Sequence, residues 1–167
     1  MARFIKKREI IKRLLTMLKN AYKNKNLDGS DVEVIYDEEE APDGINSIIL
    51  NEEEEEIEYV TIGSPRDKDR TLGLVVYINI ASEDNSVELR DEFECTLEDA
   101  IGNSREDSDL NFLLEGDGLT IYRKEWSRRG EYFDDIKTCK CYLKAFYRNE
   151  ENDNSYWFKQ KLEKKRF

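Results

Sequence analysis

Carboxylate side chains gathered in two runs are the residues of this sequence best suited to chemistry. The first run covers residues 37–40 and the second covers residues 52–56. Clustered carboxylates are the ligands that Ca²⁺ and Mg²⁺ prefer. Neither run, however, has the alternating D-x-D-x-D-G spacing of a dedicated calcium loop. We therefore expect solvated acidic surfaces, with no metal and no cofactor bound.

Nucleophilic chemistry has little support in the sequence. The chain has no histidine, which excludes Ser-His and Cys-His catalytic systems. Cys139 and Cys141 supply half of a structural zinc site at most, and Cys95 is the third cysteine. No glycine-rich nucleotide-binding motif is present. We expect reduced, buried thiols with structural roles and a protein that is not an enzyme.

Charge is sorted along the chain. Residues 1–25 carry nine Lys or Arg against one acid, Glu9, whereas residues 28–58 carry fourteen acids and no base. The segment 159–166 is basic again. Blocks of one sign are typical of surfaces that meet partners. The net charge of −11 disfavours non-specific binding to DNA or anionic membranes. No apolar run is long enough for a membrane span or a signal peptide, so we expect synthesis in a cytoplasm.

Apolar spacing predicts the elements that position these groups. Period-3.6 patterns predict helices over residues 3–23 and 85–101. Short apolar or alternating runs predict strands over residues 32–36, 45–50, 57–62, 72–80, 119–127 and 132–148. In the last run, Cys139, Cys141 and Leu143 share a buried face, and Lys140 and Lys144 share the solvated one. The short apolar run 110–114 is ambiguous.

The order of these elements is α-β-β-β-β-α-β-β. That order predicts an α+β fold in which two helices pack on a mostly antiparallel sheet. The strand over residues 72–80 is apolar on both faces, so we expect it to be central. We expect one α+β domain over residues 1–148 and a C-terminal extension over residues 149–167.

Order and spacing also carry a family resemblance. The amphipathic N-terminal helix is followed by Val34-Ile35-Tyr36-Asp37-Glu38, Ala41-Pro42-Asp43 and the apolar run 45–50. An acidic stretch then leads into a hairpin ending in residues 72–80, a helix beginning at Ser86-Val87-Glu88-Leu89, and a closing hairpin over residues 119–148. Over residues 3–148 the chain resembles the tail-terminator (tail-completion) proteins of long-tailed bacteriophages. The segment 149–167 is an addition to that pattern.

The resemblance implies a virion structural protein at the junction of tail and head. Copies of the chain would form a ring, usually a hexamer, that caps the tail tube and joins it to head-completion or neck proteins. DNA would pass through without specific binding, and no membrane would be involved. A lumen crossed by DNA should be acidic, because a basic one would hold the phosphates. The expected channel-lining residues are Glu52, Glu53, Glu54, Glu55 and Glu56.

Ring closure needs a heterologous contact between neighbouring copies. The basic face of the first helix and the acidic strand segment are complementary, and we expect their contact to weaken with salt. The charged loop 66–70 and the turn Arg128-Arg129 are expected to contact the tail tube. Trp126, Trp157 and Phe158 are expected either to anchor a partner or to complete the core. The interface candidates are Lys12, Arg13, Lys19, Arg66, Lys68, Arg70, Trp126, Arg128, Arg129, Trp157 and Phe158.

Two other classes of function stay open at this point. An acidic inhibitor that mimics DNA, of the anti-restriction or anti-CRISPR type, predicts a monomer or dimer with negative charge spread along one face. An enzyme using a carboxylate-bound metal predicts thermal stabilisation by Mg²⁺, Mn²⁺ or Ca²⁺.

Overall fold

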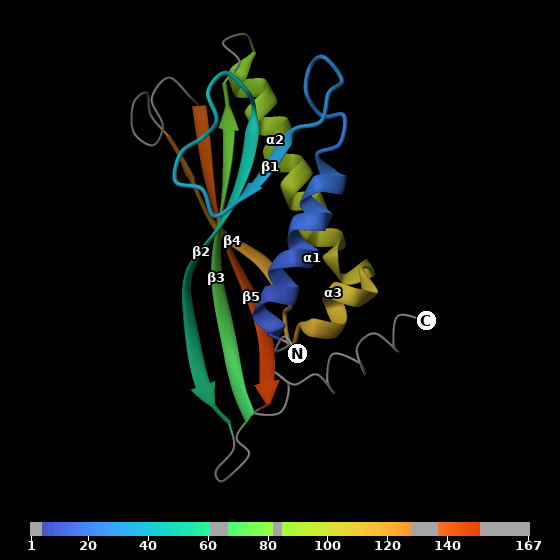
Figure 1. Cartoon of the computed structure of the whole chain (residues 1–167), viewed down its shortest axis with the longest axis vertical. Helices are drawn as coiled ribbons and strands as arrows, with labels where there is room; N and C mark the ends of the chain where they lie inside the picture. Colours follow the sequence, from blue (N-terminus) through green and yellow to red (C-terminus); the bar gives the residue numbers. More distant parts are fainter. Residues whose placement is uncertain (1–4, 61–66, 82–84, 128–136, 151–167) are drawn as a thin grey trace.

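The structure is a computed structural model that describes residues 5–60, 67–81, 85–127 and 137–150. Its helices are α1 (Lys6–Ala21), α2 (Ser86–Gly102), the 3₁₀ turn η1 (Asn103–Glu106) and α3 (Ser108–Leu113). Its strands are β1 (Glu33–Tyr36), β2 (Ser47–Tyr59), β3 (Asp67–Ile80), β4 (Leu119–Trp126) and β5 (Lys137–Glu150). Figure 1 shows the helices gathered on one side of the long, twisted sheet.

The five strands form one sheet in the order β1-β2-β3-β5-β4. Strand β3 is central, as expected, and it joins the β2–β3 hairpin to the β4–β5 hairpin. The sheet is mixed rather than mostly antiparallel, because β1 runs parallel to β2. This correction has a simple cause. The connection over residues 37–46 returns to the start of β1, so that β2 runs alongside β1 in the same direction. The spacing of apolar residues does not encode the path of such a connection.

The acidic run was expected to separate two short strands, and this expectation is wrong. Strand β2 continues through all the glutamates, so three strands rather than four precede α2. The continuous strand β3 supplies the pairing partner throughout. A β-bulge between Glu52 and Glu54 lies against Gly73, where an added Cβ would come within 3.1 Å of Glu54 Cγ. The close approach of the bulge explains the glycine in an apolar strand.

Helix α1 confirms the predicted amphipathic segment. Its apolar stripe, which is buried against the sheet and the other helices, consists of Ile10, Ile11, Leu14 and Leu18. The buried Lys6 Nζ donates a 2.6 Å hydrogen bond to the carbonyl of Arg148, which ties the start of α1 to the end of β5.

Helix α2 is also confirmed, with Leu89, Phe93, Leu97 and Ile101 buried. Its N-cap is Asn85, which has the left-handed backbone conformation (φ 54°). The ambiguous apolar run lies in a third helix, α3, which Asp107 caps by accepting hydrogen bonds from two backbone amides. The prediction of two helices is corrected accordingly.

The core lies between the helices and one face of the sheet. Strand β5 alternates as predicted: Cys139, Cys141, Leu143 and Ala145 are fully buried on the helix side. The two thiols are free, with their sulfur atoms 3.6 Å apart. Cys95 is free but exposed on α2, which corrects the expectation that all three thiols are buried.

Candidate interaction surface

Strand β2 changes character at its midpoint. Residues 47–50 are fully buried and pair with β1 on one side and β3 on the other. Residues 51–59 pair with β3, and β1 does not reach them. Most of their side chains are exposed. The expected channel-lining glutamates lie in this second half, on an edge of the sheet.

The five glutamates do not form one surface, because alternation along a strand sends neighbours to opposite faces. Glu52 lies on the helix side, where Lys7 Nζ of α1 is 3.1 Å from one carboxylate oxygen and the Tyr36 hydroxyl donates to the other at 2.7 Å. Burial alone would raise the pKa of Glu52, but these two hydrogen bonds outweigh it and lower that pKa. Burial and the same carboxylate raise the pKa of Tyr36 to about 12.

Glu55 also lies on the helix side, and its carboxylate binds other side chains of the same chain. Arg70 forms an ion pair with it, and the Tyr147 hydroxyl donates to it at 3.1 Å. Burial, together with the Glu55 charge, raises the pKa of Tyr147. Arg70, an interface candidate, is therefore bound to its own sheet.

Glu53, Glu54 and Glu56 are exposed. Glu54 is level with Gly73 and Glu56 with Thr71 across β3, on the sheet face that carries no helix. Partial burial and the charges of Glu53 and Glu54 raise the pKa of Tyr122 on β4. They differ from Glu52, whose side chain is 35% exposed but is held by Lys7 and Tyr36, and from Glu55, which is largely covered.

The basic residues of α1 likewise include some that are exposed and one that is ion-paired within the chain. Lys12 and Lys19 are exposed and can meet a partner. Arg13 is bound within the chain, with 3.0 Å to Glu9 and 2.9 Å to Asp109 of α3. Ion pairing thus leaves two of the three predicted α1 residues as surface candidates.

Trp126 is half exposed, but its indole N–H is anchored. It donates to both oxygens of Glu94 at 3.1 Å. Glu94 is buried on α2 and also lies 3.3 Å from Lys124 Nζ, which pairs in turn with Glu98. Burial works against the charge of Lys124, yet its pKa is raised, because the bonds to Glu98 and Glu94 favour the charged form. Sequence reasoning missed this cluster, whose members are far apart in the chain.

Lys68, which was expected in a charged loop, lies instead in β3, near the free end of the β2–β3 hairpin. Its ammonium is 5.6 Å from the ring centre of Tyr59. The candidates Arg66, Arg128, Arg129, Trp157 and Phe158 lie outside the described residues, as do most of the extension 149–167 and residues 61–62 of the third predicted strand.

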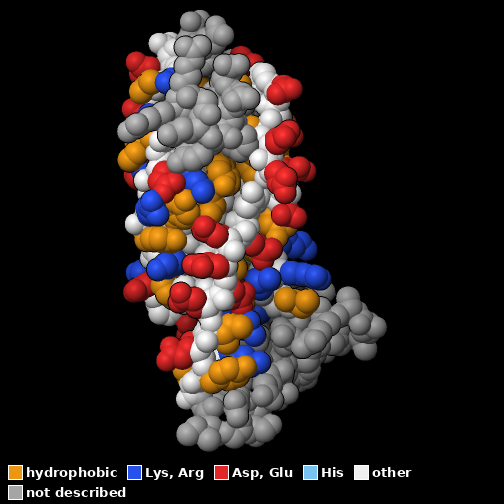
Figure 2. All heavy atoms as spheres, turned by 90° about the vertical axis from the view of Figure 1, so that its left-hand side faces the viewer, with side chains coloured by type: hydrophobic (Ala, Val, Ile, Leu, Met, Phe, Trp, Pro, Cys, Tyr) orange, Lys and Arg blue, Asp and Glu red, His pale blue; other side chains and the backbone are white. Residues whose placement is uncertain are grey.

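The helix-free face of the sheet carries a cation–aromatic cluster that the sequence analysis did not single out. Lys140 Nζ lies 5.6 Å from the ring centre of Tyr77 and 5.0 Å from that of Tyr142, and Arg123 lies 5.2 Å from Tyr142. Lys144 lies 4.5 Å from Tyr122. Figure 2 shows basic, acidic and hydrophobic side chains intermixed on this side. Charges of both signs therefore share this side of the molecule.

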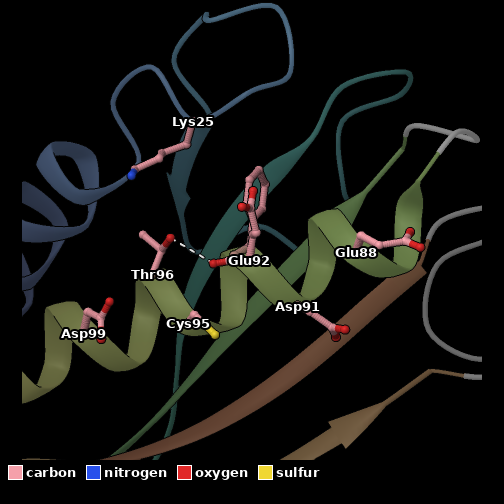
Figure 3. A pocket seen from close by; sticks show the side chains of 8 residues that line it. Lys25, Glu88, Asp91, Glu92, Cys95, Thr96 and Asp99 are labelled. Atoms are coloured by element: carbon pink, nitrogen blue, oxygen red, sulfur yellow. Dashed lines mark hydrogen bonds between the residues drawn. The ribbon is translucent and has the colours of Figure 1, made fainter.

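A shallow depression of about 570 Å³ lies along the outer side of α2 (Figure 3). Its lining residues are Lys25, Glu88, Asp91, Glu92, Phe93, Cys95, Thr96 and Asp99. The carboxylates point in different directions from successive helical turns, and the Thr96 hydroxyl donates to the Glu92 carbonyl at 2.9 Å. Such an arrangement presents negative charge but does not converge on one ion.

Two negative findings apply to the described residues. Over those ranges, no group of three or more Cys, Asp or Glu side chains is arranged to hold a metal ion. Among the helices described there, none combines the length and the apolar character needed to cross a bilayer.

Comparisons with known proteins give little. No family model matches the chain, and no curated protein matches it. Among solved structures, it is similar to a chain from the virion of a native gene transfer agent particle, with 15% sequence identity and a TM-score of 0.39. That similarity covers 69% of this chain and 78% of the other. Similarity at this level carries no argument about fold or function.

Proposed function

We propose that this chain is a non-enzymatic structural protein of a phage virion, a tail terminator that forms a ring at the end of the tail tube. The observation that supports the proposal is the arrangement of the sheet. Helices cover one face. The sheet has an acidic edge along the second half of β2, which the short outer strand β1 does not reach, and a second edge at the outer strand β4 on the opposite side. Two different patches on opposite sides are what head-to-tail assembly requires.

The proposed partners are further copies of the chain, the tail tube protein and a head-completion or neck protein. Lys12 and Lys19 on α1 and the hairpin end around Lys68 are the described candidates for these contacts. The outward glutamates Glu53, Glu54 and Glu56 are the proposed lumen residues, because Glu52 and Glu55 are neutralised by Lys7 and Arg70. DNA would be repelled rather than bound there.

Assembly is tested first by sedimentation velocity and electron microscopy, over a range of protein concentrations and from dilute buffer to molar salt. We expect rings that weaken as salt screens the exposed charges. A species that stays monomeric even with purified tail tubes present would contradict the proposal, as would an assembly equally stable in molar salt.

The lumen assignment is tested by the triple substitution Glu53→Lys, Glu54→Lys and Glu56→Lys. It should impair DNA passage or retention in particles assembled at protein concentrations high enough for rings still to form. A matched control places three lysines at Glu38, Glu39 and Glu40, which lie in the exposed β1–β2 connection. Normal DNA behaviour in the first variant, or the same defect in the control, would contradict the assignment.

One observation favours the second candidate, an acidic inhibitor that mimics DNA. The outer side of α2 carries Glu88, Asp91, Glu92 and Asp99 around the depression of Figure 3. This candidate predicts a monomer or dimer that displaces DNA from a DNA-binding defence protein. Substituting those four acids by their amides would abolish displacement without affecting folding.

A further inference from the structure

The second half of β2 presents an unusually long open edge. Residues 51–59 pair with β3 on one side, and among the described strands none pairs with them on the other. Backbone N–H and C=O groups along such an edge are ready to pair with another strand. An edge of this length normally needs protection from uncontrolled association.

The glutamates supply that protection and also select the partner. If two β2 edges met, the acids of one copy would face those of the other, and like charges placed opposite each other destabilise a strand pair. Self-pairing through this edge is therefore disfavoured. A strand carrying positive charge is favoured for the same reason.

The chain itself offers such a strand at the other border of the sheet. Strand β4 pairs with β5, and among the described strands none pairs with its outer side. Of its two bases, Arg123 forms an ion pair with Glu125, and Lys124 forms ion pairs with Glu94 and Glu98 of α2. Lys140 and Lys144 of the neighbouring strand β5 add positive charge on the helix-free face, against Tyr142 and Tyr122. Tyr122, Arg123 and Trp126 are exposed. Its eight residues can cover most of the open half of β2.

We propose that the open edge of β2, residues 51–59, pairs with the β4 edge of a second copy, so that the sheets of neighbouring copies join head to tail. The inference rests on the proposed ring and specifies its contact. Since β2, β3, β5 and β4 alternate in direction, β4 runs opposite to β2. Repetition of the sheet therefore gives an antiparallel junction.

The register of the sheet adds a geometric condition. Across β5 and β3, Leu119 is level with Glu55 and Trp126 with Ile48, so β4 lies level with residues 48–55 of β2 in its own copy. Strand β1 covers residues 47–50 of β2. The incoming β4 must then be displaced along the strand direction, towards Tyr59. A stagger of this kind is required when a sheet closes on itself.

Cysteine cross-linking tests the junction directly. In a Cys95→Ser background, in which the other two thiols are buried, one chain carries Glu56→Cys and a second chain, with a tag of different length, carries Arg123→Cys. Both are mixed at low salt and treated with a short bifunctional maleimide. We expect a cross-linked species containing one chain of each kind, and at most traces when either variant is treated alone.

The control pairs Lys12→Cys, an exposed site on α1, with Arg123→Cys and should not cross-link. Efficient linking of the Glu56→Cys variant to itself would overturn the inference, because it would mean that β2 meets β2. Linking of the control at the level of the test pair would also overturn it.

Charge reversal separates this inference from the ring proposal. Glu54→Lys with Glu56→Lys should weaken self-association about tenfold, and adding Arg123→Glu to the same chain should restore part of it. If the parent chain fails to assemble at all, the ring proposal and the inference fail together. If it assembles with salt sensitivity but shows neither the cross-link nor the charge rescue, the β2–β4 junction alone is wrong.

Discussion

The two halves of β2 differ sharply although they belong to one strand. Ile48, Ile49 and Leu50 are fully buried, whereas Ile57 is 48% exposed and Tyr59 is 57% exposed. The first half is flanked by strands on both sides, and the second half by β3 on one side. The β2–β3 hairpin extends past the helix layer in Figure 1.

The comparison teaches that regular secondary structure and burial are set by different neighbours. Pairing with β3 is enough to keep the backbone extended through the glutamates. Burial requires a covering layer, and the helices supply it over the first half. The first half therefore stabilises the fold, and the second half is available for contacts with other molecules.

The largest expected difference between the two halves is the loss of stability when one apolar side chain in each half is shortened to alanine. Leu50→Ala should lower the free energy of unfolding by about 3 kcal/mol, because it opens a cavity in the core. Ile57→Ala should change it by less than about 0.5 kcal/mol, because that side chain is half exposed. Urea denaturation followed by circular dichroism measures both. Equal losses would mean that the second half is also covered.

The next effect compares an inner ion pair with an outer one. Arg70→Met should cost about 1–2 kcal/mol, because it leaves the largely covered Glu55 with fewer partners. Asp69→Asn, which breaks the exposed pair with Arg148, should cost roughly 0–0.5 kcal/mol. Denaturation in low and high salt checks the difference, and the reverse order would contradict the assignment of inner and outer faces.

A smaller effect on the free energy of unfolding should appear at low pH, and it comes from Glu52, which lies where the two halves of β2 meet. The pKa of Glu52 is lowered from its ordinary value of 4.5 in the folded chain, so the unfolded chain binds more protons as the pH falls. Its contribution to stability is present above pH 4.5 and is lost as the pH drops through the lower folded pKa. Glu52→Gln should flatten this part of the stability profile, and Tyr36→Phe should flatten it partly. An unchanged slope in both variants would contradict the role of the Tyr36–Glu52–Lys7 contacts.

The last prediction needs no substitution and measures how well the helix layer shields the cysteine thiols from a reagent. Cys95 should react quickly with a thiol reagent in the native protein, because it is exposed. Cys139 and Cys141 should react only on unfolding. Both are buried. The contact with the Cys141 thiol is the larger cause, and burial the second, of the raised pKa of Cys139. Rapid reaction of all three thiols would mean that the helix layer opens readily.

Several elements were predictable from local pattern. The apolar stripe of α1, the period-2 alternation of β5 and the two-sided apolar character of β3 each specify their element through neighbours close in sequence. The glutamate run misled the prediction because local strand propensity is low there, while pairing with β3 overrides it. The parallel β1–β2 pairing depends on the path of a connection and has no periodic signal.

The candidate surface was predictable only as a set of residue types. That Lys12 and Lys19 are basic and Glu53, Glu54 and Glu56 are acidic is written in the chain. Their exposure, and the internal pairing of Arg13, Arg70, Glu52 and Glu55, depend on partners up to 96 residues away. The Glu94–Trp126 cluster is of the same kind.

The sequence by itself determined which residues alternate, which segments coil and where each sign of charge is found, because these properties depend on a residue and its near neighbours. Only the tertiary structure decided which charges are neutralised, which half of β2 is covered and which strand edges stay open. The physical reason is that ion pairs, burial and strand pairing join groups from distant segments, and their distances are fixed when the sheet and the helix layer pack together.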